Sequence, residues 1–123
     1  MTKIVIDYKF LNLNETINIS RRNVYMANNS KKKEMEVVRM STIGIKKIEN
    51  YPVEIVFLWH IKNINSDLDN KLPKVILDSL VESKILENDS LKYISKITHT
   101  YVKDKKDYVE MEIKHETKQN SER

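Results

Sequence analysis

The sequence contains no cysteine, one glycine and two prolines in 123 residues. The absence of cysteine excludes disulfide bonds and thiolate metal sites, and it is typical of proteins that work in a reducing compartment. The sequence also lacks any run of about 18 or more apolar residues, so no segment is predicted to span a membrane as a helix. The segment after Met1 reads as a strand rather than as a signal peptide. We therefore expect a cytoplasmic protein with no membrane partner.

Charge, by contrast, is abundant: 22 Lys and Arg residues stand against 18 Asp and Glu residues, which gives a net charge of +4. The length suffices for one domain with a modest core, which we expect over residues 1–114. Residues 115–123 lack apolar side chains and are expected to form a disordered tail. If several acids gather at one metal site, the remaining surface is more basic than the net charge indicates and favours a polyanionic partner. A charge of +4 is also common in small soluble proteins.

Apolar periodicity predicts an α+β domain in the order strand, helix, strand, helix, strand, strand, with a mixed sheet packed against helices. The first helix is expected to begin at Lys31, after a Ser30 cap, and to end near Gly44. Residues 11–29 are expected to be loop with at most a short helical piece. The strand at 53–62 is apolar on both sides, so we place it in the middle of the sheet with both faces covered. The predicted strands are residues 3–10, 53–62, 93–102 and 108–114, the last two forming a hairpin.

Two aspartates on alternate residues, Asp67 and Asp69, precede the second predicted helix, and Asp89 follows it. Alternate residues of an extended chain lie on the same side, so the first two can reach one ion. Three carboxylates gathered in one place repel one another unless a hard divalent cation is bound among them. Oxygen-only ligands favour Mg²⁺ or Mn²⁺ over zinc. The structural alternative, a helix-capping role, explains one aspartate but not all three.

The start of the second helix is predicted from Asn70, a favourable N-cap, with Pro73 inside the first turn. A helix N-terminus directly after two aspartates favours anions and phosphates. His60 lies near the end of the central strand and is left out of the predicted site, because a lone histidine there is more often a packed or solvent-facing residue than a ligand.

The sequence around this helix has DLDN at residues 67–70, Lys74, DSL at residues 78–80 and ND at residues 88–89. This series resembles the RusA family of Holliday junction resolvases. The family's signature is DxDN, a lysine, DxL and a terminal (D/N)D. This sequence departs from the signature by one extra residue before the lysine, and Lys84 stands where many members have glycine.

The N-terminal half carries further likeness to a form of this family from bacteria and their phages. The matching stretches are LNE at residues 13–15, RRN at residues 21–23 and the lysine run at residues 31–33. With the order of strands, the resemblance extends over residues 3–114.

The resemblance implies a homodimeric, Mg²⁺-dependent endonuclease, with Mn²⁺ as a possible substitute, that resolves four-way DNA junctions in recombination and repair. The family's metal-binding acids correspond to Asp67, Asp69 and Asp89, and its catalytic lysine corresponds to Lys74. Lys71 lies close by in the sequence and is the alternative catalytic lysine. The candidates for phosphate contacts are Arg21, Arg22, Lys31, Lys32, Lys33, Lys46, Lys47 and Lys71. The alternative is that these side chains are ordinary solvated charges on the surface.

The chemistry of phosphodiester hydrolysis agrees with these residue types. A carboxylate-held Mg²⁺ activates water and neutralises charge on the phosphate, and a lysine one turn into a helix can stabilise the negative charge that develops. A two-fold dimer with two sites matches a junction that is cut on two strands. Two alternatives remain open: a basic DNA-binding protein without catalytic activity, and a nuclease for flaps or other branched DNA.

Overall fold

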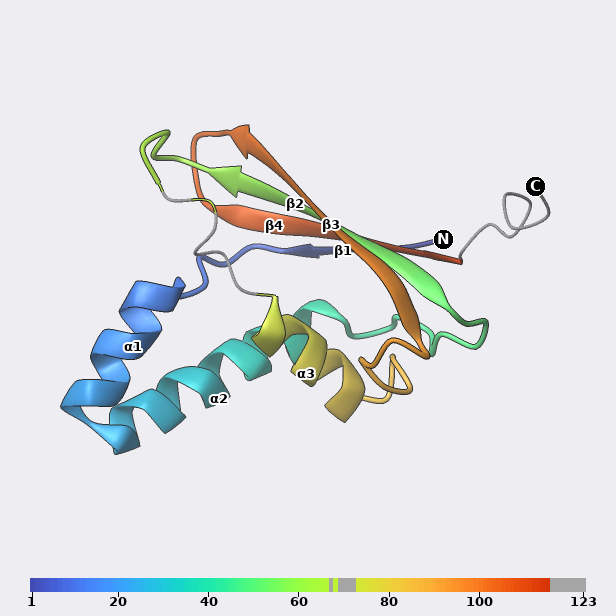
Figure 1. The fold of residues 1–123 in the computed structure, drawn as a ribbon, viewed down its shortest axis with the longest axis horizontal. Helices are drawn as coiled ribbons and strands as arrows, with labels where there is room; N and C mark the ends of the chain where they lie inside the picture. Colours follow the sequence, from blue (N-terminus) through green and yellow to red (C-terminus); the bar gives the residue numbers. More distant parts are fainter. Residues whose placement is uncertain (67, 69–72, 116–123) are drawn as a thin grey trace.

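The computed structural model of the protein describes residues 1–66, 68 and 73–115, with residues 13 and 14 described by their backbone alone (Figure 1). It confirms the α+β class, with a mixed sheet and one helix more than predicted. No helix within the described ranges is long and apolar enough to cross a lipid bilayer. The elements are β1 (Thr2–Ile6), α1 (Leu13–Arg22), α2 (Val24–Ser41), β2 (Val53–Ile61), α3 (Lys74–Glu82), β3 (Ile94–Lys103) and β4 (Tyr108–His115).

The sheet has the strand order β1-β4-β2-β3, in which β2 runs parallel to β3 and antiparallel to β4. The predicted hairpin of β3 and β4 is therefore wrong, because β2 lies between the two strands. Their connection crosses the end of β2, where the Asp104 N–H donates to the Ile61 carbonyl at 2.9 Å and the Asp107 carboxylate accepts from the Lys62 N–H at 3.0 Å. Strands two places apart are separated by about 10 Å, a distance that a short connection spans.

The central position predicted for β2 is confirmed, but the covering of both sheet faces is not. Every odd-numbered residue of β2 is buried, and the helices lie on that face of the sheet (Figure 1). No element within the described chain covers the other face, where Val56 and Leu58 are half-buried between neighbouring strands. Strand β1 ends at Ile6, earlier than predicted.

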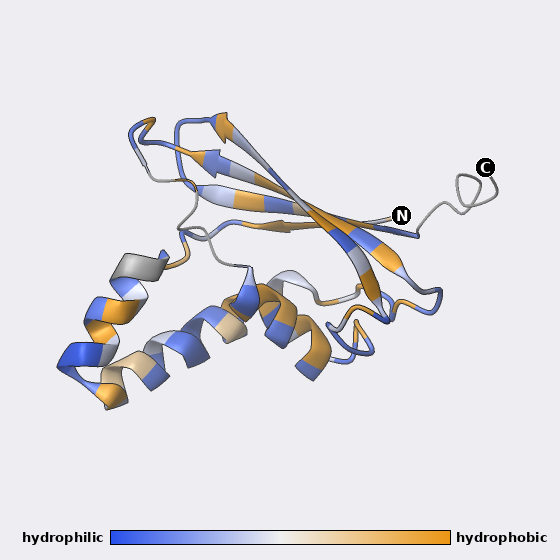
Figure 2. Cartoon of the chain, viewed as in Figure 1, coloured by the Kyte–Doolittle hydropathy of each residue, from blue (hydrophilic) through white to orange (hydrophobic). Residues whose placement is uncertain are grey.

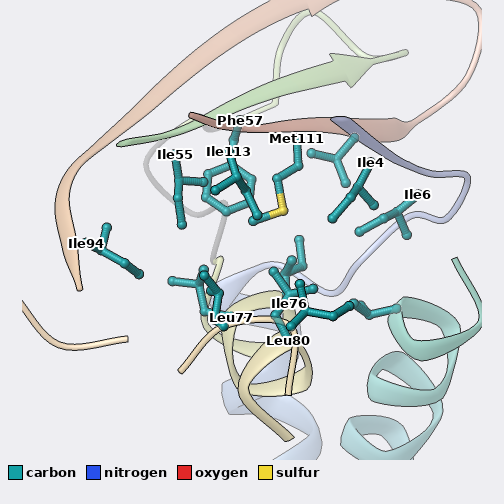
Figure 3. Packing of buried hydrophobic residues seen from close by; sticks show 14 of the residues in the cluster. Ile4, Ile6, Ile55, Phe57, Ile76, Leu77, Leu80, Ile94, Met111 and Ile113 are labelled. Atoms are coloured by element: carbon teal, nitrogen blue, oxygen red, sulfur yellow. The ribbon is translucent and has the colours of Figure 1, made fainter. Parts of the chain in front are cut away.

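The core forms where α3 packs against the covered face of the sheet. In Figure 3, Ile4, Phe57 and Met111 point from three strands toward Ile76 and Leu80 of α3, and all five side chains are buried. Figure 2 shows that α3 is hydrophobic over much of its surface, whereas α1 and α2 have mixed surfaces. Burial of this kind, at about 25 cal/mol per Å² of apolar area, fixes the position of α3 and of Lys74 at its first turn.

Most of the stretch predicted as loop, residues 11–29, is helical instead. Asn12 forms a capping box with Glu15 at the start of α1, and the Asn23 side chain accepts from the Met26 N–H at 3.2 Å at the start of α2. The asparagines are therefore helix caps rather than loop residues. Helix α2 begins well before the predicted Ser30 cap, so the lysine run lies in its middle and not in its first turn.

Helix α3 begins after Pro73 and ends in a turn at Lys84. Pro73 is the N-cap residue, not part of the first turn as predicted, while Asn70 lies outside the described residues. At the other end Lys84 has a φ of 63°, in the left-handed region. The Lys84 N–H donates to Val81 O at 3.0 Å and the Ile85 N–H to Leu80 O at 2.9 Å, which together form a Schellman motif.

Candidate functional site

Lys74 belongs to a cluster of charges shared by α2 and α3. The Lys74 Nζ lies 3.4 Å from Asp78 Oδ2, one turn further along α3, and the Lys31 Nζ from α2 lies 4.0 Å from the same oxygen. The two lysine side chains are 77% and 53% exposed. Exposed ion pairs contribute only about 0–1 kcal/mol to stability, so a phosphate can take over these contacts at little cost. The structure thus gathers two of the predicted lysines around one carboxylate.

A cavity of about 280 Å³ lies next to this cluster, between α1, α2 and α3. Its walls are mainly apolar and include Leu11, Ile19, Ala27 and Val75, while the lysines and the aspartate of the cluster also line it. A concave apolar site with a few converging polar groups is the usual form of a small-ligand site. The cavity therefore extends the charged cluster into a possible binding site.

Glu34 is the buried polar group of this cavity. It is 6% exposed, and its Oε2 accepts from the Leu11 N–H at 2.8 Å, the one hydrogen bond of this carboxylate within the described residues. Burial raises the pKa of the Glu34 carboxyl above its ordinary 4.5, the Leu11 bond lowers it, and the charge of Glu15 raises it again. A carboxylate so placed has room for a further hydrogen-bond donor on the cavity side.

Sequence reasoning missed Glu34, although a signal for it exists. Ala27, Glu34 and Val38 are spaced by seven and four residues, so they share the inward face of α2, and Val38 is fully buried. An acid on an otherwise inward-facing stripe marks a buried carboxylate. The pattern was not recognised because the helix was predicted to begin at Lys31, so Ala27 was not assigned to the same helix.

Two of the three predicted metal ligands, Asp67 and Asp69, lie outside the described residues, as does Lys71. Asp89 is described: it is exposed in the loop between α3 and β3, and its N–H donates to Asn88 Oδ1 at 2.6 Å. Within residues 1–66, 68 and 73–115, no three His, Cys, Asp or Glu side chains are grouped to hold a metal ion. The shared ion of the three aspartates stays a prediction.

The described neighbours of these acids lie at opposite ends of β2. Leu68 lines a shallow hollow with Ile61 and Tyr101 at the carboxyl end. Asp89 precedes Ile94, which pairs with Val53 at the amino end. Nine residues of strand separate these ends by about 26 Å. Figure 1 shows the α3–β3 loop and the end of β2 on opposite sides of the molecule.

The other predicted phosphate contacts within the described residues lie on α1, on α2 and after the end of α2, and they are all exposed. Arg21 and Arg22 lie where α1 turns into α2, at the tip of a helical arm that projects away from the sheet (Figure 1). Lys32 and Lys33 follow Lys31 in the middle of α2. Lys46 and Lys47 follow the other end of α2, and the Lys47 Nζ lies 3.4 Å from Glu87 Oε2. This distribution spans the length of α2, about 27 Å, which suits an extended phosphate backbone better than a single phosphate.

His60 is a packed residue, one of the two structural roles that the sequence left open for it. Its side chain is 10% exposed, its Nδ1 lies 2.8 Å from Asp104 Oδ2, and its Nε2 lies 3.4 Å from Glu110 Oε2. The ring stacks on Tyr108 at a centroid distance of 3.9 Å. The pKa of Asp104 is lowered, chiefly by the Lys105 N–H and then by the hydrogen bond to His60. This cluster ties β2 to the connection that crosses its end.

Comparison with known proteins adds no relative. No protein-family model matches this sequence, and no curated protein matches it either. The likeness to the RusA resolvases therefore depends on the motif residues themselves.

Proposed function

We propose that the protein is a divalent-metal-dependent endonuclease of branched DNA, a Holliday junction resolvase of the RusA type. The observation that carries the proposal is the motif series Asp67, Asp69, Lys74 and Asp89 around α3. The exposed pair of Lys74 and Lys31, held by one carboxylate, supports it because such a pair suits a DNA phosphate. The chemistry of the acids fits Mg²⁺, with Mn²⁺ as a substitute.

In this proposal Asp67 and Asp69 hold the ion, which when bound supplies an activated water and neutralises charge on the phosphate. Lys74 donates to a phosphate oxygen or to the leaving oxygen and stabilises the negative charge that builds up there. Asp78, 3.4 Å from the Lys74 Nζ, orients the ammonium group from one turn away. Lys31 binds the same strand, and Lys71 is the alternative catalytic lysine.

In the proposed homodimer, Asp89 belongs to a site assembled from two copies of the chain. Within one chain Asp89 and Leu68 lie at opposite ends of β2, so an ion next to Leu68 would receive its third carboxylate from Asp89 of a second copy. Strand β3 is an edge of the sheet formed by the described residues, and an edge strand can pair with a strand of another chain. Antiparallel pairing of β3 with its copy would bring opposite strand ends together around a two-fold axis.

The direct test replaces Asp69 with asparagine and measures cleavage of a synthetic four-way junction in Mg²⁺. We expect Asp69→Asn to abolish cleavage while junction binding persists or strengthens, because repulsion of phosphate is relieved. Asp7→Asn is the matched control, since Asp7 is an exposed aspartate outside the motif that pairs with Lys106. Equal cleavage by Asp69→Asn and Asp7→Asn would reject the assignment.

A second test asks whether Asp89 acts across the dimer. Inactive Asp69→Asn and Asp89→Asn proteins are unfolded together, refolded as a mixture and assayed for nicking of the junction. If Asp89 serves the other copy, each mixed dimer regains one intact site and nicks one strand. If Asp89 serves its own chain, both sites of the mixed dimer stay defective and no activity returns.

A basic DNA-binding protein without catalysis is the second candidate, and the basic residues along α2 favour it. It predicts junction binding that weakens with salt and no strand scission in any divalent metal. Parallel assays of junction, flap and linear duplex then separate a resolvase from a nuclease of other branched DNA.

A further inference from the structure

The cavity between the three helices combines features that a phosphate contact alone does not need. A lysine pair on an exposed surface is sufficient to hold a phosphate, yet here Lys31 and Lys74 border an apolar space of about 280 Å³. Glu34 is buried at this space and repels phosphate rather than attracting it. The ligand therefore has two parts: an anionic part for the lysines and an uncharged part with N–H donors for Glu34.

The size and walls of the cavity restrict the uncharged part further. Pockets for drug-sized molecules measure about 300–1,000 Å³, so this cavity suits a single small ring system. Phe10 lines it and is held edge-to-face against Tyr8 at a centroid distance of 5.1 Å. Ile19 and Ala27 line it from α1 and α2. Enzymes hold a base taken out of its stack between aromatic and apolar side chains, with hydrogen bonds to the edge of the base.

We propose that this cavity binds one unpaired DNA base that presents N–H donors to Glu34, while Lys31 and Lys74 hold the phosphate of the same strand. The proposal rests on the proposed nuclease function for the identity of the ligand. It adds a specificity-determining residue, Glu34, outside the motif.

Guanine is the base that fits Glu34 best. An ionised carboxylate only accepts hydrogen bonds, and guanine presents two adjacent donors, its ring N1–H and its amino group. Adenine and cytosine present an amino group next to a ring nitrogen that would face the carboxylate as a second acceptor. Thymine presents one N–H between two carbonyl oxygens. The expected order is guanine first, adenine and cytosine next, and thymine last.

The experiment measures binding of short single strands to the full chain by fluorescence anisotropy, in EDTA so that no cleavage takes place. An all-thymine strand is compared with strands that carry one central guanine, adenine or cytosine. We expect the guanine strand to bind about tenfold more tightly than the thymine strand, the discrimination that a good two-bond contact gives. The salt dependence of both strands should be equal, because both use the same lysines.

Three variants assign the preference to the cavity. Glu34→Gln keeps an oxygen for the Leu11 N–H but loses the charge, and it should lose the guanine preference while still binding the thymine strand. Ala27→Leu fills the cavity from α2 and should have the same effect. Glu36→Gln is the matched control, because Glu36 is an exposed acid on the same helix that pairs with Arg39. It should leave the preference intact.

The outcomes separate this proposal from the nuclease itself. A guanine preference that survives in both Glu34→Gln and Ala27→Leu overturns the cavity assignment, and so does a wild-type protein with no base preference or no binding of single strands. A preference that depends on Glu34, in a protein that cleaves no junction in Mg²⁺, upholds the base site and overturns the proposed activity alone.

Discussion

Replacing Lys84 with glycine should stabilise the protein, because Lys84 occupies the position of the Schellman motif where the backbone is left-handed. Its φ is 63°, a conformation that costs a residue with a Cβ about 1–2 kcal/mol. Glycine avoids this cost but loses about 0.5–1 kcal/mol through the greater freedom of its unfolded chain. The difference predicts a gain of about 0.5–1 kcal/mol, or about 2–5 °C in Tm for a domain of this size.

The assay is urea unfolding followed by circular dichroism, with Lys84→Ala as the control. Alanine removes the charge and the long side chain but keeps the Cβ, so any gain specific to glycine reports the backbone. The neighbouring bonds from Lys84 to Val81 and from Ile85 to Leu80 should persist in both variants. If Lys84→Gly and Lys84→Ala unfold at the same urea concentration, left-handed strain at this turn is refuted.

Three further predictions concern single contacts. Burial raises the pKa of the Glu34 carboxyl in the folded protein, so Glu34 reduces stability progressively as pH rises past 4.5. Glu34→Gln should therefore gain on the wild type as pH rises past 4.5, and a difference in urea midpoint that does not change with pH would contradict this. Ser79→Ala removes the 3.0 Å bond from the buried Ser79 Oγ to the Met35 carbonyl and should cost about 1 kcal/mol in chemical denaturation. Trp59→Phe removes the 2.9 Å bond from the indole N–H to His99 Nδ1 and should cost about 1–2 kcal/mol, measured in the same way; an unchanged midpoint would show that this bond is not stabilising.

The parts of the fold that could be predicted are those with a strong local period. The odd-numbered residues of strand β2, from Val53 to Ile61, are all apolar, and they are the buried ones. The break at Gly44 was predicted correctly, and its φ of 87° explains why glycine stands there. At these two places the local sequence is compatible with one secondary structure only.

The errors occurred where a residue type serves two structures equally well. Asparagine favours turns and helix N-caps alike, and Asn12 and Asn23 are caps. Two strands joined by a short polar connection suggest a hairpin, yet nothing local records that β2 is inserted between β3 and β4. Strand order depends on contacts between distant residues, which a local pattern does not contain.

The candidate site was predictable only in part. The motif marks Lys74, and the structure adds its neighbours Asp78 and Lys31, the second of them from a different helix. Glu34 was not predicted because charged residues on a helix are usually solvated. The position of Asp89 relative to Leu68 follows from the parallel pairing of β3 with β2, a contact between distant residues that no local pattern records.

The pairing of β1 with β4 has a consequence for how the protein is made. Thr2 is matched with Ile113, so the first strand of the described chain finds its partner in the last one. During synthesis on the ribosome, residues 2–6 cannot pair with β4 until residues 108–115 have emerged. The entropy cost of bringing β1 and β4 together must be met before their contacts form, and topologies with such distant contacts fold slowly. We therefore expect the nascent chain to complete its sheet only once β4 has been made, and a chain stalled before β4 to expose one edge of β2 to aggregation.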